Sequence, residues 1–223
     1  RVGEVVAFQQ AVESDAGQVT VNQRFALFYA EKRPFFLEGI ELFSTPNQLV
    51  YTRRIVDPIG GGKVTGKIGK TGFAFLSARD QGGTRDTWSN ITRLRRDVGA
   101  NSLAGLTYTD RTNPDGSNRV AAADARIVFK KLYYVLGQAG GSWTGKGGLV
   151  TTAPMFQAEF DRTARIWGFN YRVSGFGQAF DAQSGFVPRN NFVELRSFNR
   201  FSRYGKRGAL LELHRMLRDG EVE

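Results

Sequence analysis

The chain has 223 residues, enough for one large all-β domain or two small ones. Its 41% hydrophobic content excludes a disordered chain, and its 27 glycines and 18 phenylalanines suit many short strands joined by tight turns. It contains no cysteine, which excludes disulfides, thiolate metal sites and cysteine nucleophiles. Lysine and arginine exceed aspartate and glutamate by 31 to 21, and the net charge of +10 fits either an anionic partner or a solvated surface. The sequence has no apolar run long enough for a transmembrane helix, whereas membrane strands carry only a weak, alternating signal.

Two weakly strand-like runs, 4–9 and 18–29, open the chain. A stretch that mixes charged and large apolar residues follows, and it reads Glu31-Lys32-Arg33-Pro34-Phe35-Phe36-Leu37-Glu38-Gly39. Because proline disfavours a helical conformation of the residue before it, we predict only a short helix or an apolar wedge near residues 34–43. Residues 1–47 are interpreted as a lead-in or linker that contains this stretch, and residues 48–223 as a β-rich body.

From residue 48 onward, runs of strand-forming residues alternate with turn signals. Strands are expected over 48–56, 63–68, 71–79, 88–98, 102–111, 119–130, 132–144, 151–162, 165–174, 191–203 and 206–218. Glycine and proline turns are expected at 60–62 and 113–116. Successive runs are spaced as hairpins, so the predicted fold class is all-β, an antiparallel up-and-down meander.

Several of these runs alternate apolar and polar residues with a period of two. Their polar faces carry Asp124 and Arg126, Glu159 and Asp161, and Arg172. A soluble sandwich would turn the apolar faces together, whereas a membrane barrel would turn them to lipid and the polar faces to its lumen. Strands of about ten residues, with aromatic residues near their ends, favour the barrel. The five polar residues would then line the lumen.

A cationic lining of the lumen is a further hypothesis, and charge pairing with aspartates is an equally simple explanation of the same residues. The arginines concerned are Arg53, Arg54, Arg93, Arg95, Arg96, Arg126 and Arg172. A basic lumen would favour anionic solutes.

The 31–39 stretch is followed by Leu42-Phe43 and by Tyr51-Thr52-Arg53-Arg54-Ile55, with further matching segments at 61–67, 94–99, 108–111 and 185–189. Together they resemble a family of bacterial outer-membrane β-barrel proteins of uncharacterised function, whose members carry an N-terminal carbohydrate-binding domain similar to family 9 modules. The resemblance implies a Gram-negative envelope protein, of which residues 1–47 would be a periplasmic lead-in or linker and residues 48–223 part of the β-barrel. It also implies binding or transport linked to carbohydrate catabolism, through a module that lies outside this chain. The residues expected to be structural or to take part in an interaction are Glu31, Lys32, Arg33, Pro34, Phe35, Phe36, Glu38, Gly39, Arg53 and Arg54.

Candidate catalytic residues have simpler structural explanations. His214 is the only histidine, and a plain residue on a strand face explains it more simply than a Ser-His-Asp triad. With one histidine and no cysteine, a zinc site is not expected either. Glu159 and Asp161 have the spacing of two acids on one strand face, which glycoside hydrolysis could use, but lumen carboxylates paired with arginines explain them more simply. We therefore predict no catalytic residue, no metal and no cofactor in this chain.

The sequence thus predicts a piece of an outer-membrane β-barrel protein, non-enzymatic in this part. Its expected partners are outer-membrane lipid or lipopolysaccharide, and glycans. Two alternatives remain open: a soluble β-sandwich that binds or hydrolyses carbohydrate, and a basic nucleic-acid-binding β protein. Nucleic acid is not expected as a partner, because the clearest aromatic runs face away from the charges.

Overall fold

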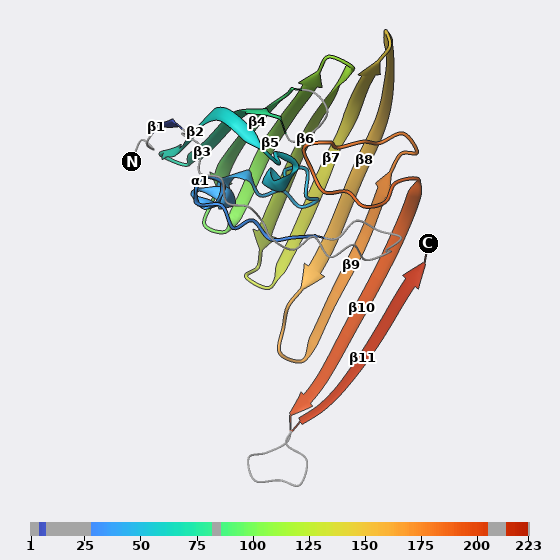
Figure 1. The fold of residues 1–223 in the computed structure, drawn as a ribbon. Helices are drawn as coiled ribbons and strands as arrows, with labels where there is room; N and C mark the ends of the chain where they lie inside the picture. The colour runs from blue at the N-terminus through green and yellow to red at the C-terminus, as the bar shows by residue number, and fades with distance from the viewer. Residues whose placement is uncertain (1–4, 8–27, 82–85, 205–212, 223) are drawn as a thin grey trace.

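Residues 5–7, 28–81, 86–204 and 213–222 are described by the computed structural model, the first and last of these ranges by their backbone alone. They form one eleven-stranded sheet, with a short α-helix and two short 3-10 helices between its first two strands (Figure 1). The elements are β1 (Val5–Ala7), α1 (Pro34–Leu37), η1 (Ile40–Phe43), η2 (Thr52–Arg54), β2 (Pro58–Ile68), β3 (Thr71–Asp80), β4 (Thr87–Val98), β5 (Ser102–Asn113), β6 (Gly116–Phe129), β7 (Tyr133–Lys146), β8 (Leu149–Arg162), β9 (Trp167–Phe176), β10 (Phe192–Tyr204) and β11 (Leu213–Val222).

Every strand pairs antiparallel with its neighbours in sequence, and the order runs from β1 to β11 without a crossover. The predicted all-β meander is therefore confirmed, and so is the short helical segment near residues 34–43, which is α1 followed by η1. β1 and β11 stand at the two ends of the strand order, so the sheet is open within the described residues.

The strand predicted over 48–56 is wrong. These residues form an irregular segment that contains η2. The backbone of the segment bonds to the loop between β9 and β10 instead of to a strand: Phe186 N donates to Gln48 O at 2.8 Å, and Tyr51 N donates to Ser184 O at 2.8 Å. Strand propensity is overridden here by a contact with a distant loop.

The turn predicted at 60–62 is also wrong, because these glycines lie inside β2 and pair with β3. Gly61 approaches β3 so closely that a Cβ at this position would come within 2.5 Å of the Ser77 carbonyl oxygen. A glycine inside a strand often marks such a close approach of two backbones.

Three predicted strand runs extend beyond the described residues. Of the run 4–9, residues 5–7 form β1, and residues 4, 8 and 9 lie outside the described ranges. Of the run 18–29, the structure describes only Phe28 and Tyr29, and neither lies in a strand. Of the run 206–218, residues 213–218 belong to β11, and residues 206–212 lie outside the described ranges.

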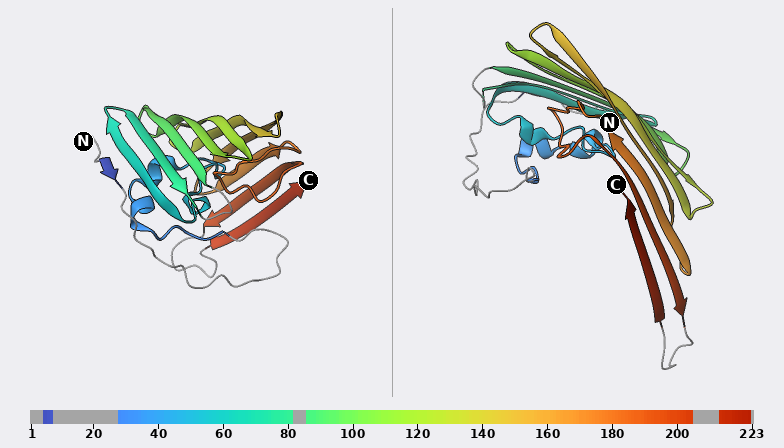
Figure 2. Two further views of the ribbon diagram at one scale, coloured as in Figure 1. Left: turned by 45° about the horizontal axis from the view of Figure 1, so that its top comes forward. Right: turned by 90° about the vertical axis from the view of Figure 1, so that its right-hand side faces the viewer.

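The sheet is strongly curved, and α1, η1 and η2 lie on its concave side together with the β9–β10 loop (Figure 2). Residues that pair across strands point to the same face of a sheet. One register row on the concave face is at most 1% exposed and consists of Leu76, Ile91, Thr109 and Val120. The neighbouring row points to the convex face and includes Phe75 and Tyr108, which are 42% and 43% exposed.

Two apolar clusters fill the concave side. The first joins the helical segment to β3 and β4 and contains Phe36, Phe43, Ile55, Ala74, Leu76, Ala78 and Ile91. The second joins Leu49 and the β9–β10 loop to the middle strands and contains Leu49, Val120, Ala122, Ala153, Met155, Phe176, Phe180 and Ala182. The core of this chain is thus the space between the sheet and the segments that its concave face encloses.

Candidate functional site: the concave face of the sheet

Residues 28–57 and 177–191 together cover part of the concave face, and we call them the inner layer. Its helical start has a clear local cause. Pro34 occupies the first turn of α1, where its missing N–H costs nothing. Gly39 follows with a φ of +66°, a left-handed conformation that glycine adopts readily. The chain therefore turns sharply between α1 and η1, and this turn lets Phe36 and Phe43 both enter the first cluster.

Glu31 and Arg33 form a clamp that fixes η2. Arg33 Nε and Nη2 donate to the two Glu31 carboxylate oxygens at 2.9 and 2.8 Å, and Thr52 Oγ1 donates to Glu31 Oε2 at 2.6 Å. Arg33 also donates to the carbonyl oxygens of Ile55 and Thr52, and its guanidinium lies 4.2 Å from the Phe36 ring centroid. Burial by itself would raise the pKa of the Glu31 carboxyl, but hydrogen bonds from Arg33 and Thr52 outweigh it and lower the pKa to about 2.

Lys63 of β2 anchors the helical segment to the sheet. Its side chain is only 2% exposed, and Nζ donates to the carbonyl oxygens of Phe35 and Glu38, each at 2.5 Å. These carbonyls lie at the end of α1, where the last turn leaves acceptors unsatisfied and a cation is favoured. The Glu38 carboxylate lies farther away, at 3.9 Å, and is 60% exposed, so the backbone contacts carry this interaction.

Arg93 and Asp124 form a buried ion pair across β5. Arg93 Nη1 and Nη2 donate to Asp124 Oδ1 and Oδ2 at 2.5 and 2.9 Å, and Arg93 Nη1 also donates to Thr107 Oγ1. β5 lies between the two partners, and Gly105 makes the contact possible. A Cβ at Gly105 would come within 2.6 Å of the Arg93 guanidinium nitrogens. Both charged side chains are at most 2% exposed. Removing either partner would leave the other charge buried and unpaired, which strongly lowers the stability of the fold.

The β9–β10 loop is tied to β6 and β7 through side chains of the sheet. Asn118 Nδ2 donates to Asp181 O at 3.0 Å, and Gln183 N donates to Asn118 Oδ1 at 3.0 Å. Asp181 N donates to Ser142 Oγ at 3.1 Å. Polar strand residues on the concave face thus satisfy the loop backbone, which a buried loop requires.

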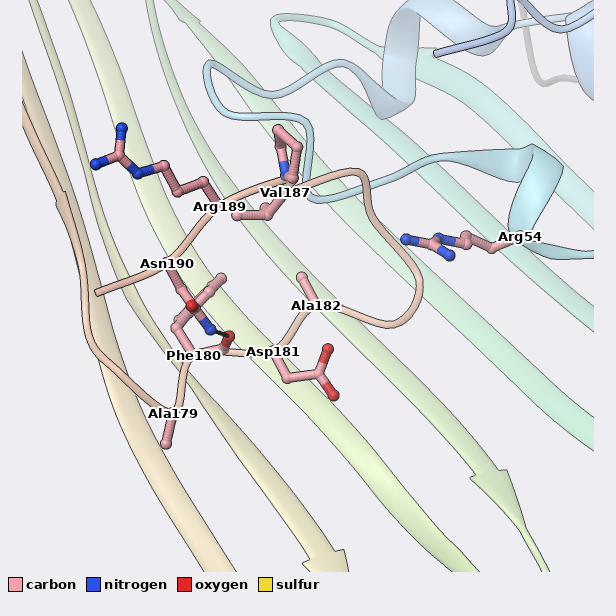
Figure 3. A pocket seen from close by; sticks show the side chains of 9 residues that line it. Arg54, Ala179, Phe180, Asp181, Ala182, Val187, Arg189 and Asn190 are labelled. Carbon is pink, nitrogen blue, oxygen red and sulfur yellow. Dashed lines mark hydrogen bonds between the residues drawn. The ribbon is translucent and has the colours of Figure 1, made fainter. Parts of the chain in front are cut away.

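The two parts of the inner layer also bind each other. Arg54 Nε donates to Gly185 O at 3.0 Å, and Gly185 passes so close to the lead-in that a Cβ would come within 2.7 Å of Gln48 O. A small polar cavity of about 260 Å³ remains at this junction, lined by Arg54, Ala179, Phe180, Asp181, Ala182, Val187, Pro188, Arg189 and Asn190. Figure 3 shows the side chain of Arg54 reaching toward the loop from η2. The cavity is a polar gap between two parts of the inner layer.

A second group of charged residues lies on the concave face outside these contacts. Both Glu159 oxygens are occupied: Tyr134 Oη and Asn170 Nδ2 donate to Oε1 at 2.5 and 2.7 Å, and Arg172 Nε donates to Oε2 at 3.0 Å. Asn170 Nδ2 also donates to Asp161 Oδ2 at 3.1 Å. We call this group the Glu159 cluster, and all its partners come from the strands β7, β8 and β9.

Arg126 joins the Glu159 cluster through an aromatic ring. Its guanidinium lies 4.3 Å from the Tyr134 ring centroid, a distance typical of a cation–π contact. The cluster therefore contains four of the five residues expected to line a lumen, namely Arg126, Glu159, Asp161 and Arg172. Asp124, the fifth, lies on the same face but belongs to the buried pair with Arg93.

The arginines that were expected to line the lumen together lie in different parts of the structure. Arg93 is buried in its ion pair, and Arg53 and Arg54 belong to the inner layer, where Arg53 Nη1 donates to Ala30 O at 3.1 Å. Arg96 faces the opposite side of the sheet, because it pairs with Thr71 and Ala104 in a register row that points to the convex face. The interpretation of Arg96 as a lining residue is therefore wrong.

Among the residues predicted from the 31–39 stretch, Glu31, Arg33 and Phe36 meet in space. Two residues that the sequence did not identify complete these contacts: Lys63, which anchors the 31–39 stretch, and Gly105, which lets Arg93 reach Asp124. A glycine in the middle of an alternating strand is a sequence signal for close approach. It does not tell which side chain passes over it, and that depends on the register of three strands. His214 lies in β11, of which only the backbone is described.

A family model described as "Domain of unknown function (DUF5916)" matches residues 8–67. The match includes the 31–39 stretch, Arg53, Arg54 and Lys63, so the similarity is to the inner-layer lead-in and the first long strand. No curated protein and no solved structure matches the chain.

Two features are absent from the described ranges. These ranges contain no helix with the length and apolar character needed to cross a membrane. They also contain no group of three or more histidine, cysteine, aspartate or glutamate side chains placed to hold a metal ion.

Proposed function

We propose that this chain forms part of the wall of a membrane β-barrel, with the inner layer filling part of its lumen. The observation that carries the proposal is the exposed apolar surface on the convex face of the sheet. This face exposes large apolar side chains, including Phe75, Leu106, Val135, Phe156 and Leu195, each at least 41% exposed. The concave face carries the two apolar clusters and, beside them, buried polar and charged groups such as Arg93 and Asp124. An exposed apolar face of this kind is costly for a sheet in water and typical of a barrel in lipid.

The spacing of the aromatic side chains on the convex face supports the proposal. Tyr133 and Trp143 lie near opposite ends of β7 and point to this face. Ten residues at about 3.4 Å each separate them by roughly 34 Å along the strand. A tilt of about 45° reduces this to roughly 24 Å across a membrane, close to the ~25 Å apolar band of membrane barrels. The residues between them on this face are Val135, Gly137, Ala139 and Gly141.

Further strands would have to pair with β1 and β11 to close the barrel, because a closed sheet leaves no unpaired edge in the membrane. The inner layer would stay in the lumen of the closed barrel, because it is bound to β2 through Lys63 and to β6 through Asn118. This arrangement would leave the Glu159 cluster as the part of the lumen wall that solutes can reach.

We extend the proposal to the outer membrane of a Gram-negative bacterium, and to binding or transport linked to carbohydrate use. The support for this is the resemblance carried by the 31–39 and 51–55 segments. The role in carbohydrate use would depend on a module outside this chain. Fractionation of the expressing cells, with the protein followed in outer-membrane vesicles, tests the location.

The alternative of a soluble carbohydrate-hydrolysing protein has less support. Both oxygens of Glu159 are occupied by protein donors, and Asp161 shares Asn170 with it, so neither acid is presented to a substrate. A chain that hydrolyses glycans and loses this activity in Glu159→Gln or Asp161→Asn would restore the alternative.

The decisive experiment compares arginine substitutions at two depths of the convex face. Leu106 is 58% exposed near the middle of β5, and Ile68 is 66% exposed beside the turn at 69–70. In a bilayer, Leu106→Arg should cost about 2–4 kcal/mol and Ile68→Arg about 0–1 kcal/mol. The measurement is urea unfolding in lipid vesicles.

In water, both substitutions replace an exposed leucine or isoleucine and should stay within about 0.5 kcal/mol. Equal and small effects at the two positions, or a wild-type chain that stays folded and monomeric without detergent or lipid, would overturn the barrel proposal.

A further inference from the structure

The two ends of the sheet differ in chemistry. We call one end the basic rim; it contains the turns at 69–70, 99–101, 130–132 and 163–166. The other end, the acidic rim, contains the turns at 114–115 and 147–148 and the β9–β10 loop. Alternate turns of a meander lie at the same end, so the strand order alone assigns each turn to a rim.

Beside the basic rim, the convex face carries a continuous aromatic band. Phe129, Tyr133 and Phe160 are stacked with ring centroids 5.4 to 6.4 Å apart. Trp167 stacks on Phe201 at 6.1 Å. Aromatic side chains at such a position favour the boundary between acyl chains and headgroups.

An arginine is inserted into this band. Arg162 donates from Nε to Tyr133 Oη at 2.9 Å and from Nη1 to the Trp167 carbonyl oxygen. Its guanidinium lies 5.4 Å from the Tyr133 ring centroid and 5.0 Å from that of Trp167. Arg162 therefore places a positive charge at the level of the aromatic band.

The basic rim also carries cations without a carboxylate partner. Lys130, Lys131, Arg165 and Arg203 are all exposed, and none of them forms an ion pair within the part of the chain that the structure describes. Arg165 instead lies 4.4 Å from the Tyr204 ring centroid. Four exposed cations thus lie at the basic rim, beside the aromatic band.

On the convex face near the acidic rim, the arginines are neutralised. Arg79 pairs with Asp86, and Arg119 Nε donates to Asp110 Oδ1 at 3.0 Å. The aromatic residues at this end are Trp88 and Trp143, 50% and 40% exposed. Both ends therefore suit a membrane interface. Within the described residues, several exposed cations without an ion pair gather at the basic rim, whereas near the acidic rim Arg79 and Arg119 are paired and Lys146 is the exposed cation beside the turn at 147–148.

We infer that the basic rim binds the phosphate groups of anionic lipids and so lies in the leaflet richer in anionic headgroups. This inference rests on the proposed function and adds the partner and the orientation of the sheet. Each lysine or arginine near an anionic membrane surface strengthens binding about five-fold, and the effect is screened by salt.

The three tryptophans of the chain make a test possible, because Trp167 lies at the basic rim and Trp88 and Trp143 lie at the acidic rim. The double variant Trp88→Phe/Trp143→Phe reports the basic rim, and Trp167→Phe reports the acidic rim. Each protein is reconstituted in phosphatidylcholine vesicles that contain brominated phosphatidylglycerol or, as a reference, brominated phosphatidylcholine. Quenching of tryptophan fluorescence measures the local preference for the anionic lipid.

We expect Trp167 to be quenched preferentially by brominated phosphatidylglycerol, and Trp88 and Trp143 to be quenched equally by both lipids. Lys130→Gln/Lys131→Gln/Arg165→Gln should reduce the preference at least ten-fold. The control Arg79→Gln/Arg119→Gln/Lys146→Gln changes the net charge equally and should leave the preference at Trp167 unchanged. Inorganic phosphate should compete weakly compared with the lipid.

Equal quenching of Trp167 by the two lipids, or an equal loss in both triple variants, would overturn the lipid inference while leaving the barrel intact. Absence of quenching by either lipid would show that the chain does not enter the bilayer, and would overturn the proposed function as well.

Discussion

The covered and uncovered parts of the concave face use charge differently. Beneath the inner layer, Lys63 and Arg93 are at most 2% exposed, and each meets acceptors that neutralise or solvate it. In the Glu159 cluster the carboxylate is as deeply placed, but its partner Arg172 is 38% exposed. The first region uses charges to hold chain segments together, whereas the second keeps a charged surface within reach of solvent. Substitutions of charged residues should therefore lower the free energy of unfolding more beneath the inner layer than in the Glu159 cluster.

The largest effect is expected at Arg93. Arg93→Leu leaves Asp124 buried without a counter-charge and should lower the free energy of unfolding by about 3–5 kcal/mol. The double variant Arg93→Leu/Asp124→Leu should recover most of this loss, because neither charge is then buried. Arg95→Leu, two residues away on the same face, serves as the control and should cost under about 1 kcal/mol. Urea unfolding provides the measurement, and equal costs at positions 93 and 95 would contradict the buried pair.

A smaller effect is expected at Lys63. Lys63→Met removes charge-assisted hydrogen bonds to the carbonyls of Phe35 and Glu38 and should cost about 2–3 kcal/mol. Hydrogen exchange should show that the amides of residues 34–43 lose protection before those of β3. The control Glu38→Gln alters only an exposed carboxylate at 3.9 Å and should change stability by under about 0.5 kcal/mol. Equal effects would mean that the ion pair, and not the end of the helix, holds the segment.

The clamp at Glu31 should make the inner layer sensitive to acid. Its pKa of about 2 in the folded chain lies below the ordinary value of 4.5, so its stabilisation is present above pH 4.5 and is lost as the pH falls toward 2. Unfolding measured across this range should show a slope that Glu31→Gln reduces. An unchanged slope in the variant would show that the stabilisation has another source.

The smallest effect is expected in the Glu159 cluster. Arg172→Gln should cost under about 1 kcal/mol, because the arginine is partly exposed and Tyr134 and Asn170 continue to donate to Glu159. The same urea unfolding assay measures it. A cost comparable to that of Arg93→Leu would remove the distinction between the two regions.

Local sequence patterns determined much of the fold. The hairpin turns and the period-two alternation of the β6 and β8 segments predicted the meander, because strand side chains alternate faces whatever the tertiary structure. Pro34 likewise predicted only a short helical segment or apolar wedge near residues 34–43, since proline restricts the backbone torsions of the residue before it. Asp124, Arg126, Glu159, Asp161 and Arg172 could be assigned to polar faces for the same reason.

Only the tertiary structure decided which partners these residues have and which face lies inside. The contact of Arg93 with Asp124 past Gly105 depends on the register of three strands. The segment at 48–56 does not join the sheet, because its backbone bonds to the β9–β10 loop. Alternation of apolar and polar residues shows that a strand has two different faces. It does not tell which of the two faces points to the inside of the folded chain. The curvature of the sheet and the docking of the inner layer decide this, and both arise from contacts between residues far apart in the sequence.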